Sequence, residues 1–479
     1  MRRPNTPEFA ILGHPNEGKS SVVSTLVEDD SVRISPTPGE TLECQDFPVI
    51  IDGVEIIRFI DTPGFQNPAQ TLSWMKKFQG PGDSLVDAFI QSHCNNPVFK
   101  NECELFSPVA EGAGIIFVVD GSRPLRNTDR AEMEILRLTG CPRMAIINNK
   151  DEDASYLHQW KNEFRKHFNA VRTFNAHRAT YAERIALLEN LKSIDQDWES
   201  PLTKVISAFQ KDWAHRNAVT VEMLCNLFTE SLTLSISKNF TDQSDEPKIK
   251  RSLQTAYGDA IQSLEKNTHR KIRKLFKQNI FNYDLPAHSI LRENLFSERT
   301  WQALGLTARQ LITTAGLAGG AVGAAIDVAA AGLTFGIFTA VGGAVGAGLA
   351  AFGGGKRLAQ TKISGLKLGG WRITIGPNEN IQFLYILIDR SLLFYSHVIN
   401  WAHGRRDYSA LDGEKRSGPV KKGFTTGWND NEKKIVRSFF EAVRSKNESE
   451  KEKSRKDMEK ILTETLRMIS NSEHRPDLV

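Results

Sequence analysis

The chain has 479 residues, a formal net charge of +4 and five cysteines. This length predicts about two or three domains, and so mild a charge does not require nucleic acid as a partner. The cysteines lack paired spacing and residues 1–5 carry no apolar targeting segment, so we expect a cytoplasmic protein in a reducing compartment.

The first predicted elements are a strand, a loop and a helix. An apolar run at 9–12 precedes the string Gly-His-Pro-Asn-Glu-Gly-Lys-Ser at 13–20, and helix-like apolar spacing continues through 20–26. Backbone N–H groups of such a loop can surround a β-phosphate, the Lys19 ammonium can reach the β- and γ-phosphate oxygens, and the Ser20 hydroxyl can ligate Mg²⁺. The string predicts a nucleoside triphosphate site formed by Gly13, Asn16, Glu17, Gly18, Lys19, Ser20 and Ser21.

A second motif, Asp61-Thr62-Pro63-Gly64, follows the next predicted strand, at 54–60. In a phosphoryl-transfer site, Asp61 can hold the Mg²⁺ shell and the Gly64 N–H can sense the γ-phosphate. The two motifs together predict that Mg²⁺ and the triphosphate lie between them.

Two further apolar runs, at 114–120 and 144–147, predict strands of a parallel sheet that is buried on both faces. Asn148-Asn149-Lys150-Asp151 follows the second run. A carboxylate there can accept hydrogen bonds from the N1 and N2 edge of guanine, a donor pattern that adenine lacks, so guanine is the favoured base. Further on, Phe174-Asn175-Ala176-His177 can place a backbone N–H on the guanine carbonyl.

Residues 9–176 resemble the translation-factor-like P-loop GTPases, in the group that includes Era, TrmE, EngA and the septins. The resemblance implies an α/β fold with a mostly parallel sheet, binding of GTP and GDP, and Mg²⁺ as cofactor. In the family's order of five motifs, Gly13–Ser20 is the first and Asp61–Gly64 the third. The resemblance adds Thr41, within Pro38-Gly39-Glu40-Thr41, as the second, and Asn175 and Ala176 as part of the fifth.

The fourth motif departs from the family's Asn-Lys-x-Asp. Either Asn148 and Asp151 keep the outer pair with Asn149 in the lysine position, or Asn149-Lys150 keep the inner pair with Glu152 as the carboxylate. We favour the first alternative, because the base-reading carboxylate decides specificity.

The resemblance also bears on hydrolysis. Phe65 stands where Ras-like enzymes have a water-orienting glutamine, so we expect slow hydrolysis without activation. In several relatives a loop asparagine helps to bind K⁺, which supplies charge in place of an arginine finger; Asn16 matches that position, or else satisfies backbone groups of the loop. The candidate catalytic residues are Lys19, Asn16, Thr41 and Gly64, and the candidate metal ligands are Ser20, Thr41 and Asp61.

The pattern divides the chain into four parts. We expect a GTPase domain at 1–180 with a helical, nucleotide-responsive insertion at about 66–110, and a helical region at 181–307. A Gly/Ala-rich apolar hairpin follows at 308–357, and the last part, 358–479, is predicted to combine strands and helices with a charged helical tail.

The Gly/Ala-rich segment has two readings. Between 311 and 355 the only charged residue is Asp327, 328–352 is long enough to span a membrane, and its glycine spacing suits close helix contact. A hairpin buried between protein helices explains the pattern too, because Gly and Ala bury little apolar area and Asp327 is costly in lipid. The segment therefore predicts peripheral or integral association with the inner membrane, with burial in protein as the alternative.

This second half resembles the C-terminal domain of unknown function that is fused to Era-like GTPases in bacteria, on the Gly-rich hairpin, Gly376-Pro377, 387–390 and 403–406. The leading hypothesis is a GTP-hydrolysing switch that docks on a membrane or a protein partner, or forms a dimer. A ribosome or RNA assembly GTPase is one alternative, disfavoured because the sequence shows neither a KH-type Gly-x-x-Gly loop nor RNP aromatics. A membrane-remodelling or pore-forming GTPase is the other.

Overall fold

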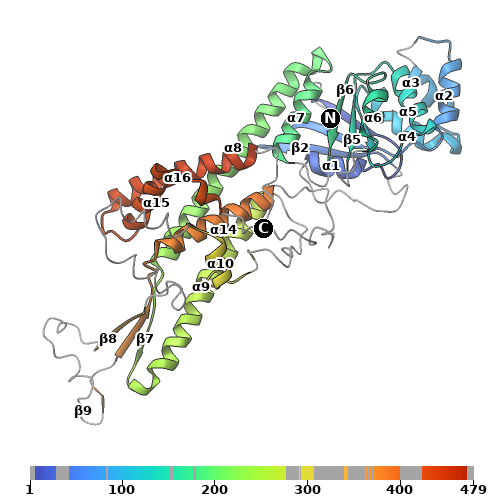
Figure 1. The fold of residues 1–479 in the computed structure, drawn as a ribbon. Coiled ribbons are helices and arrows are strands. Elements are labelled where there is room, and N and C mark those ends of the chain that lie inside the picture. The colour runs from blue at the N-terminus through green and yellow to red at the C-terminus, as the bar shows by residue number, and fades with distance from the viewer. Residues whose placement is uncertain are drawn as a thin grey trace.

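The computed structural model describes residues 6–27, 43–81, 85–149, 155–175, 180–276, 291, 293–306, 339–343, 362–363, 366–367, 371–399 and 423–471. Figure 1 shows an elongated molecule with an α/β unit at one end and an arm of strands beside a long helix at the other. A mainly helical body lies between them.

The α/β unit is built on a six-stranded sheet in the order β2-β3-β1-β4-β5-β6. Its strands are β1 (Glu8–Leu12), β2 (Gln45–Ile51), β3 (Val54–Asp61), β4 (Gly114–Asp120), β5 (Arg143–Asn148) and β6 (Ala170–Phe174). The edge strand β2 pairs antiparallel with β3, and every other neighbouring pair in this sheet is parallel. The central strands β4 and β5 are apolar on both faces and almost wholly buried, as a covered parallel sheet requires. The predicted α/β fold is confirmed.

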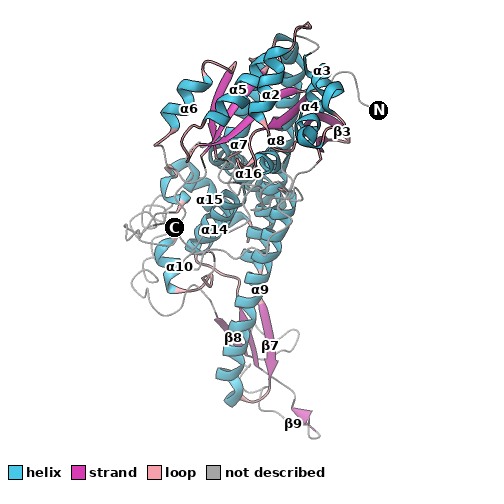
Figure 2. Cartoon of the chain, turned by 90° about the vertical axis from the view of Figure 1, so that its right-hand side faces the viewer, coloured by secondary structure: helices cyan, strands magenta, loops and turns pink. Residues whose placement is uncertain are grey.

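Helices cover both faces of this sheet (Figure 2). On one face, Phe9 and Ile11 pack with side chains of α1 (Lys19–Val27), α7 (Tyr181–Lys192) and the first turns of α8 (Gln196–Thr233). On the other, Ala10 and Leu12 pack against the remaining helices, because successive strand residues point to opposite faces. These are α2 (Pro68–Lys77), α3 (Leu85–His93), η2 (Pro97–Phe99), α4 (Lys100–Ala110), α5 (Asn127–Leu138) and α6 (Leu157–Phe164). The insertion predicted between the second motif and β4 is therefore helical, as expected.

The helical body shares α8 with the sheet. Val205 and Phe209 of α8 lie in the core beneath the sheet, whereas Leu224 and Phe228 lie in the core of the body. Around this second core pack α9 (Glu246–Leu275), α10 (Glu298–Ala303), α14 (Ile381–Ile399), α15 (Asp430–Ala442) and α16 (Glu448–Asn471). The charged tail is helical as predicted, and α16 buries an apolar stripe that includes Ile461, Leu462 and Leu466.

Helix α14 is buried along nearly its whole length, although it carries two charged residues. The Arg390 guanidinium donates to both carboxylate oxygens of Glu265, at 2.6 and 2.9 Å. The Asp389 carboxylate accepts the N–H groups of Gly305 and Thr425, both at 2.8 Å. These pairings make the burial of both charges tolerable.

The arm corrects two sequence expectations. Its three strands, β7 (Ile236–Phe240), β11 (Trp371–Ile375) and β8 (Thr339–Gly343), pair antiparallel in that order. The expectation that 181–307 is helical is wrong at β7. Strand β8 is extended where a membrane-spanning helix over 328–352 requires helical backbone.

Most of the Gly/Ala-rich segment at 308–357 lies outside the described residues, as do 403–406. Two further short strands, β9 (Lys362–Ile363) and β10 (Leu366–Lys367), pair with each other. Within the described ranges, no helix has both the length and the apolar character that crossing a bilayer requires.

Candidate nucleotide-binding site

The loop at 13–20 joins β1 to α1 at the carboxyl edge of the parallel strands, where ligands bind in open α/β sheets. Gly13 has φ +148°, and a Cβ atom there would lie 2.3 Å from the carbonyl oxygen of Val118 on β4. Asn16 also has a positive φ, of 69°, which asparagine tolerates better than most residues. The chain therefore needs Gly13 to pass close to β4 and turn into the loop.

Lys19 begins α1 and points back over the loop. Its Nζ donates to the carbonyl oxygens of Gly13, at 3.3 Å, and His14, at 3.1 Å. The side chain is buried, and this burial lowers the pKa of Lys19, against the opposing attraction of Asp61. An ammonium withdrawn from water attracts an anion more strongly than one at the surface, which suits a phosphate ligand.

Ser20 and Asp61 join the loop at 13–20 to the Asp61–Gly64 motif. The Ser20 hydroxyl donates to Asp61 Oδ2 at 2.6 Å, and the carboxylate is 2% exposed. Burial raises the pKa of Asp61, and its Oδ1 atom is buried without a hydrogen-bond partner. A hydroxyl beside an unsatisfied carboxylate oxygen fits the all-oxygen shell of Mg²⁺. Among the described residues, no group of three or more His, Cys, Asp or Glu side chains is placed to hold a metal.

The residues after Asp61 lie against the phosphate loop. A Cβ atom on Gly64 would lie 2.5 Å from the Pro15 ring, and the Phe65 N–H donates to the Gly13 carbonyl at 3.3 Å. The Phe65 ring is fully buried and meets Phe106 edge-on at 6.0 Å between centroids. The Phe65 side chain therefore faces the core, where it orients no water.

The base-reading candidates are placed in part. Asn148 is fully buried at the end of β5, and its Nδ2 donates to the Glu17 carbonyl at 3.1 Å. Asn175 follows β6 at the same edge. Ser21 is buried in the first turn of α1. Thr41, Asp151 and Ala176 lie outside the described residues, as does Glu152 of the alternative fourth motif.

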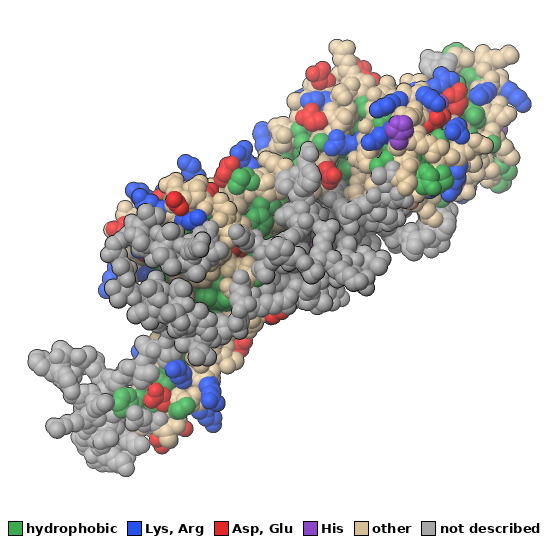
Figure 3. Space-filling view, viewed as in Figure 1, with side chains coloured by type: hydrophobic (Ala, Val, Ile, Leu, Met, Phe, Trp, Pro, Cys, Tyr) green, Lys and Arg blue, Asp and Glu red, His purple; other side chains and the backbone are tan. Residues whose placement is uncertain are grey.

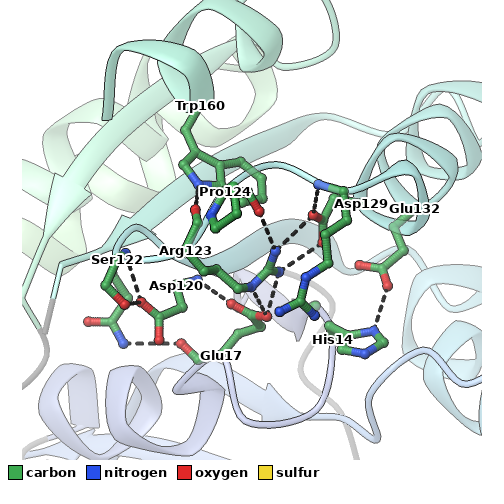
Figure 4. Close-up of polar contacts among 12 residues, drawn as sticks. His14, Glu17, Asp120, Ser122, Arg123, Pro124, Asp129, Glu132 and Trp160 are labelled. Carbon is green, nitrogen blue, oxygen red and sulfur yellow. Dashed lines mark hydrogen bonds and ion pairs between the residues drawn. The ribbon is translucent and has the colours of Figure 1, made fainter. Parts of the chain in front are cut away.

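A polar cluster beside the loop was not predicted from the sequence (Figure 4). Its centre is Arg123, which follows β4 and donates to Glu17 Oε1 through Nε at 2.8 Å and to both Asp129 oxygens at 2.8 Å. The backbone N–H of Asp120 also donates to the Glu17 carboxylate. The guanidinium lies over the ring of Trp160 at 5.1 Å, within the range of a cation–π contact. This cluster ties the phosphate loop to the β4–α5 connection.

A second pair in the same view joins His14 of the loop to Glu132 of α5, with 2.9 Å between Nδ1 and Oε1. Glu132 is fully buried, and burial raises its pKa to about 7. The hydrogen bond with Glu132 raises the pKa of His14. The pair lies next to the His14 carbonyl, which accepts a hydrogen bond from Lys19. Glu17 was predicted from the sequence as a residue of the phosphate loop, but its partners Asp120 and Arg123 were not. The only signal in the sequence was that both partners lie at the end of the strand predicted over 114–120, and therefore at the same sheet edge as the loop.

Comparison with known proteins divides the chain into two blocks. A family described as a domain of unknown function (DUF3482) matches residues 161–466, and a family described as 50S ribosome-binding GTPase matches residues 8–150.

Three relatives match the first block. The tRNA modification GTPase MnmE of Syntrophus aciditrophicus is 30% identical over 149 residues, which cover 30% of this chain and 26% of MnmE. GTPase Der of Mycoplasma pneumoniae is 23% identical over 163 residues, which cover 33% of this chain and 31% of Der. The probable GTP-binding protein EngB of Xylella fastidiosa is 27% identical over 167 residues, which cover 34% of this chain and 70% of EngB. The match thus spans less than a third of MnmE and of Der.

Proposed function

The chain belongs to the DUF3482 family and carries a P-loop GTPase domain ahead of that region, and on this premise we propose that it binds GTP with Mg²⁺ and hydrolyses it to GDP and phosphate. The observation that carries the proposal is the meeting of Lys19, Ser20 and Asp61 at one sheet edge. A buried ammonium, a hydroxyl and an unsatisfied carboxylate oxygen are the groups that a magnesium triphosphate needs.

Each residue has a proposed role. Phosphoryl transfer depends on positioning and charge neutralisation: Lys19 neutralises the β- and γ-phosphate oxygens, Ser20 and Asp61 hold Mg²⁺, and the Gly64 N–H contacts the γ-phosphate. Thr41 is proposed as a further Mg²⁺ ligand. The proposed contacts to the base come from Asn148, Asp151, Asn175 and Ala176, and the remaining loop contacts come from Gly13, Glu17, Gly18 and Ser21.

The test is GTP binding and phosphate release by the full chain. We expect Lys19→Ala to abolish both, and Lys76→Ala to leave both unchanged, because Lys76 is an exposed lysine of α2. Calorimetry with GTP and with ATP separates base selectivity from triphosphate binding. Equal affinities for the two nucleotides would overturn the guanine assignment, and phosphate release by Lys19→Ala at the wild-type rate would overturn the site.

We expect slow hydrolysis, because the buried Phe65 leaves the position of the water-orienting glutamine without a polar group. The positive φ of Asn16 places this residue at the bend of the loop, and we propose that it helps to bind K⁺ there. Hydrolysis should then be faster in K⁺ than in Na⁺, and Asn16→Ala should remove the difference. A rate that is the same in both salts for the wild-type chain contradicts the K⁺ role.

The finer proposal is a nucleotide-dependent switch whose C-terminal half docks on a membrane or a protein partner, or on a second copy of the chain. Its support is the nearly uncharged sequence at 311–355. Because β8 is extended within that segment, we favour peripheral over helix-spanning association. Centrifugation of the lysate followed by carbonate washing of the membrane fraction tests it. Protein that pellets with the membrane and is released by carbonate supports peripheral association. Protein that stays entirely in the supernatant of the first centrifugation rules out membrane association.

The names of the matched family and of MnmE favour one second candidate, a GTPase that acts on the ribosome or on RNA. Against it, the sequence shows neither a KH-type Gly-x-x-Gly loop nor RNP aromatics. Figure 3 shows both Lys or Arg and Asp or Glu side chains on the described part of this face. Co-sedimentation with ribosomes in GMPPNP but not in GDP would favour this candidate over the membrane switch.

A further inference from the structure

Helix α4 (Lys100–Ala110) contacts the chain shortly after Thr41, a proposed Mg²⁺ ligand, and shortly after Gly64, which is proposed to contact the γ-phosphate. It lies in the helical insertion on the opposite face of the sheet from α1, α7 and α8. Three of its residues make these contacts, namely Glu102, Glu104 and Phe106.

Glu102 holds the segment that follows Gly64. The side chain is fully buried, and its Oε1 accepts the backbone N–H groups of Gln66, at 2.8 Å, and Asn67, at 2.5 Å. Asn67 is the residue before α2, and its own side chain caps nothing in that helix. Instead the Asn67 side chain donates to the Val98 carbonyl at 2.7 Å. Glu102 thus holds the backbone between the Asp61–Gly64 motif and the start of α2.

Glu104 holds the other segment. Cys44 lies three residues after Thr41 in the sequence, and its backbone N–H donates to Glu104 Oε1 at 2.9 Å. The Cys44 thiol donates to the Glu104 carbonyl at 3.2 Å. Burial raises the pKa of Cys44 to about 12, so the thiol keeps the proton that it donates. One turn of α4 therefore contacts the chain on both sides of the Mg²⁺ site.

An aromatic series continues from α4 into the insertion. Phe106 meets Phe65 at 6.0 Å and Phe89 of α3 at 5.6 Å between ring centroids, both edge-on. Phe89 in turn meets Trp74 of α2 at 5.3 Å. Close-packed rings move as a unit rather than deform, so a shift of Phe65 displaces α3 and α2.

We propose that α4 is a coupling helix in which Glu102 acts as a positioning residue: it sets Gly64 for the γ-phosphate and transmits nucleotide state to α2 and α3. This inference rests on the proposed function. The physical reason is that Glu102 Oε2 is already buried without a partner. If the 66–67 backbone moved alone, the carboxylate would lose the donors of Oε1 as well, at a large desolvation cost. Segment and helix therefore move together.

Binding of GDP and of GMPPNP to the full chain tests the proposal. Glu102→Ala should lower GMPPNP affinity about tenfold, since hydrogen bonds to a charged group are lost, and should leave GDP affinity within about twofold because GDP has no γ-phosphate. Glu102→Gln keeps an oxygen acceptor, so both affinities should stay within about twofold of the wild-type values. Asp87→Ala removes an exposed acid of α3 and serves as the matched control.

Hydrogen exchange supplies a readout besides nucleotide affinity. In the wild-type chain, peptides covering 66–78 and 85–93 should be better protected with GMPPNP than with GDP, and Glu102→Ala should remove the difference. Equal protection of the wild-type chain in both states overturns the coupling. A Glu102→Ala variant that loses GDP and GMPPNP affinity alike reduces Glu102 to a structural residue. A wild-type chain that binds neither nucleotide defeats the proposed function itself, and this inference with it.

Discussion

Replacing Arg123 by alanine tests whether the cluster beside the phosphate loop stabilises the N-terminal unit. The Arg123 side chain is 14% exposed, and its partners Glu17 and Asp129 are 4% and 1% exposed. Burial opposes the charge of Arg123, but the hydrogen bonds and charges of Asp129 and Glu17 outweigh it and raise the pKa of Arg123. Arg123→Ala therefore leaves two buried carboxylates without their cation and removes the contact with Trp160.

Removing one partner of a buried ion pair costs about 3–5 kcal/mol. For a unit of this size the lower figure corresponds to a fall of about 6–12 °C in melting temperature. Scanning calorimetry of the full chain measures it on the transition that GDP raises, since a ligand stabilises the unit that binds it. The control is Arg130→Ala on α5, where the arginine is 46% exposed and its Nε lies 3.4 Å from Glu163 Oε1; it should cost less than about 1 kcal/mol. If both variants shift the transition equally, burial of the cluster contributes nothing and the reasoning is refuted.

Three further predictions concern single residues of the site. Gly13→Ala should abolish nucleotide binding and lower the melting temperature more than Gly112→Ala, because both positions have positive φ but only Gly13 would place a Cβ against backbone; equal shifts in the two variants would contradict the close approach to Val118. Asp61→Asn should remove the Mg²⁺ dependence of GMPPNP affinity, measured by calorimetry with and without EDTA, since the amide is a poorer Mg²⁺ ligand than the carboxylate; an unchanged Mg²⁺ dependence would exclude Asp61 from the metal shell. Burial raises the pKa of Glu132 to about 7, and the hydrogen bond with Glu132 raises the pKa of His14. The folded state therefore holds more protons than the unfolded state, and the contribution of the pair to stability falls as pH rises from about 5 to 8. Thermal unfolding across this range should depend less on pH in Glu132→Gln than in the wild-type chain, and an identical slope would argue against the shifted pKa values.

The sequence predicted an element well where the apolar pattern of a short stretch matches the way that element is buried in the fold. Strands β4 and β5 are continuous apolar runs, which is what a parallel sheet covered on both faces requires, and α16 shows its apolar stripe at helical spacing. Strand β7 was missed because only two residues separate it from α8 and its own period-two signal is short: Ile236 and Phe240 are apolar, but Lys238 lies between them on the same face. What makes β7 a strand is its pairing with β11, more than a hundred residues later, which no local window contains.

The site shows the same division. The meeting of Gly13, Lys19, Ser20 and Asp61 was predictable because phosphate-binding motifs place those residue types in short, fixed strings. The partners of Glu17 and His14 were not, because Arg123 and Glu132 reach the loop only through the order of the strands, in which β4 lies beside β1. A salt bridge across neighbouring strand ends leaves no spacing signal in the chain.

The two faces of the sheet separate attachment from sensing. The helical body is joined through α8, where Trp198 meets Phe9 of β1 edge-on at 4.8 Å and also packs against Gly114 of β4. Both strands are central in the sheet. Helix α4, with α2 and α3, covers the opposite face. Among the described residues, ring contacts join Phe65 to α4 through Phe106, to α3 through Phe89 and to α2 through Trp74. For this reason we expect a nucleotide-dependent partner to bind the α2–α3 side, in addition to the membrane or partner on which the C-terminal half is proposed to dock.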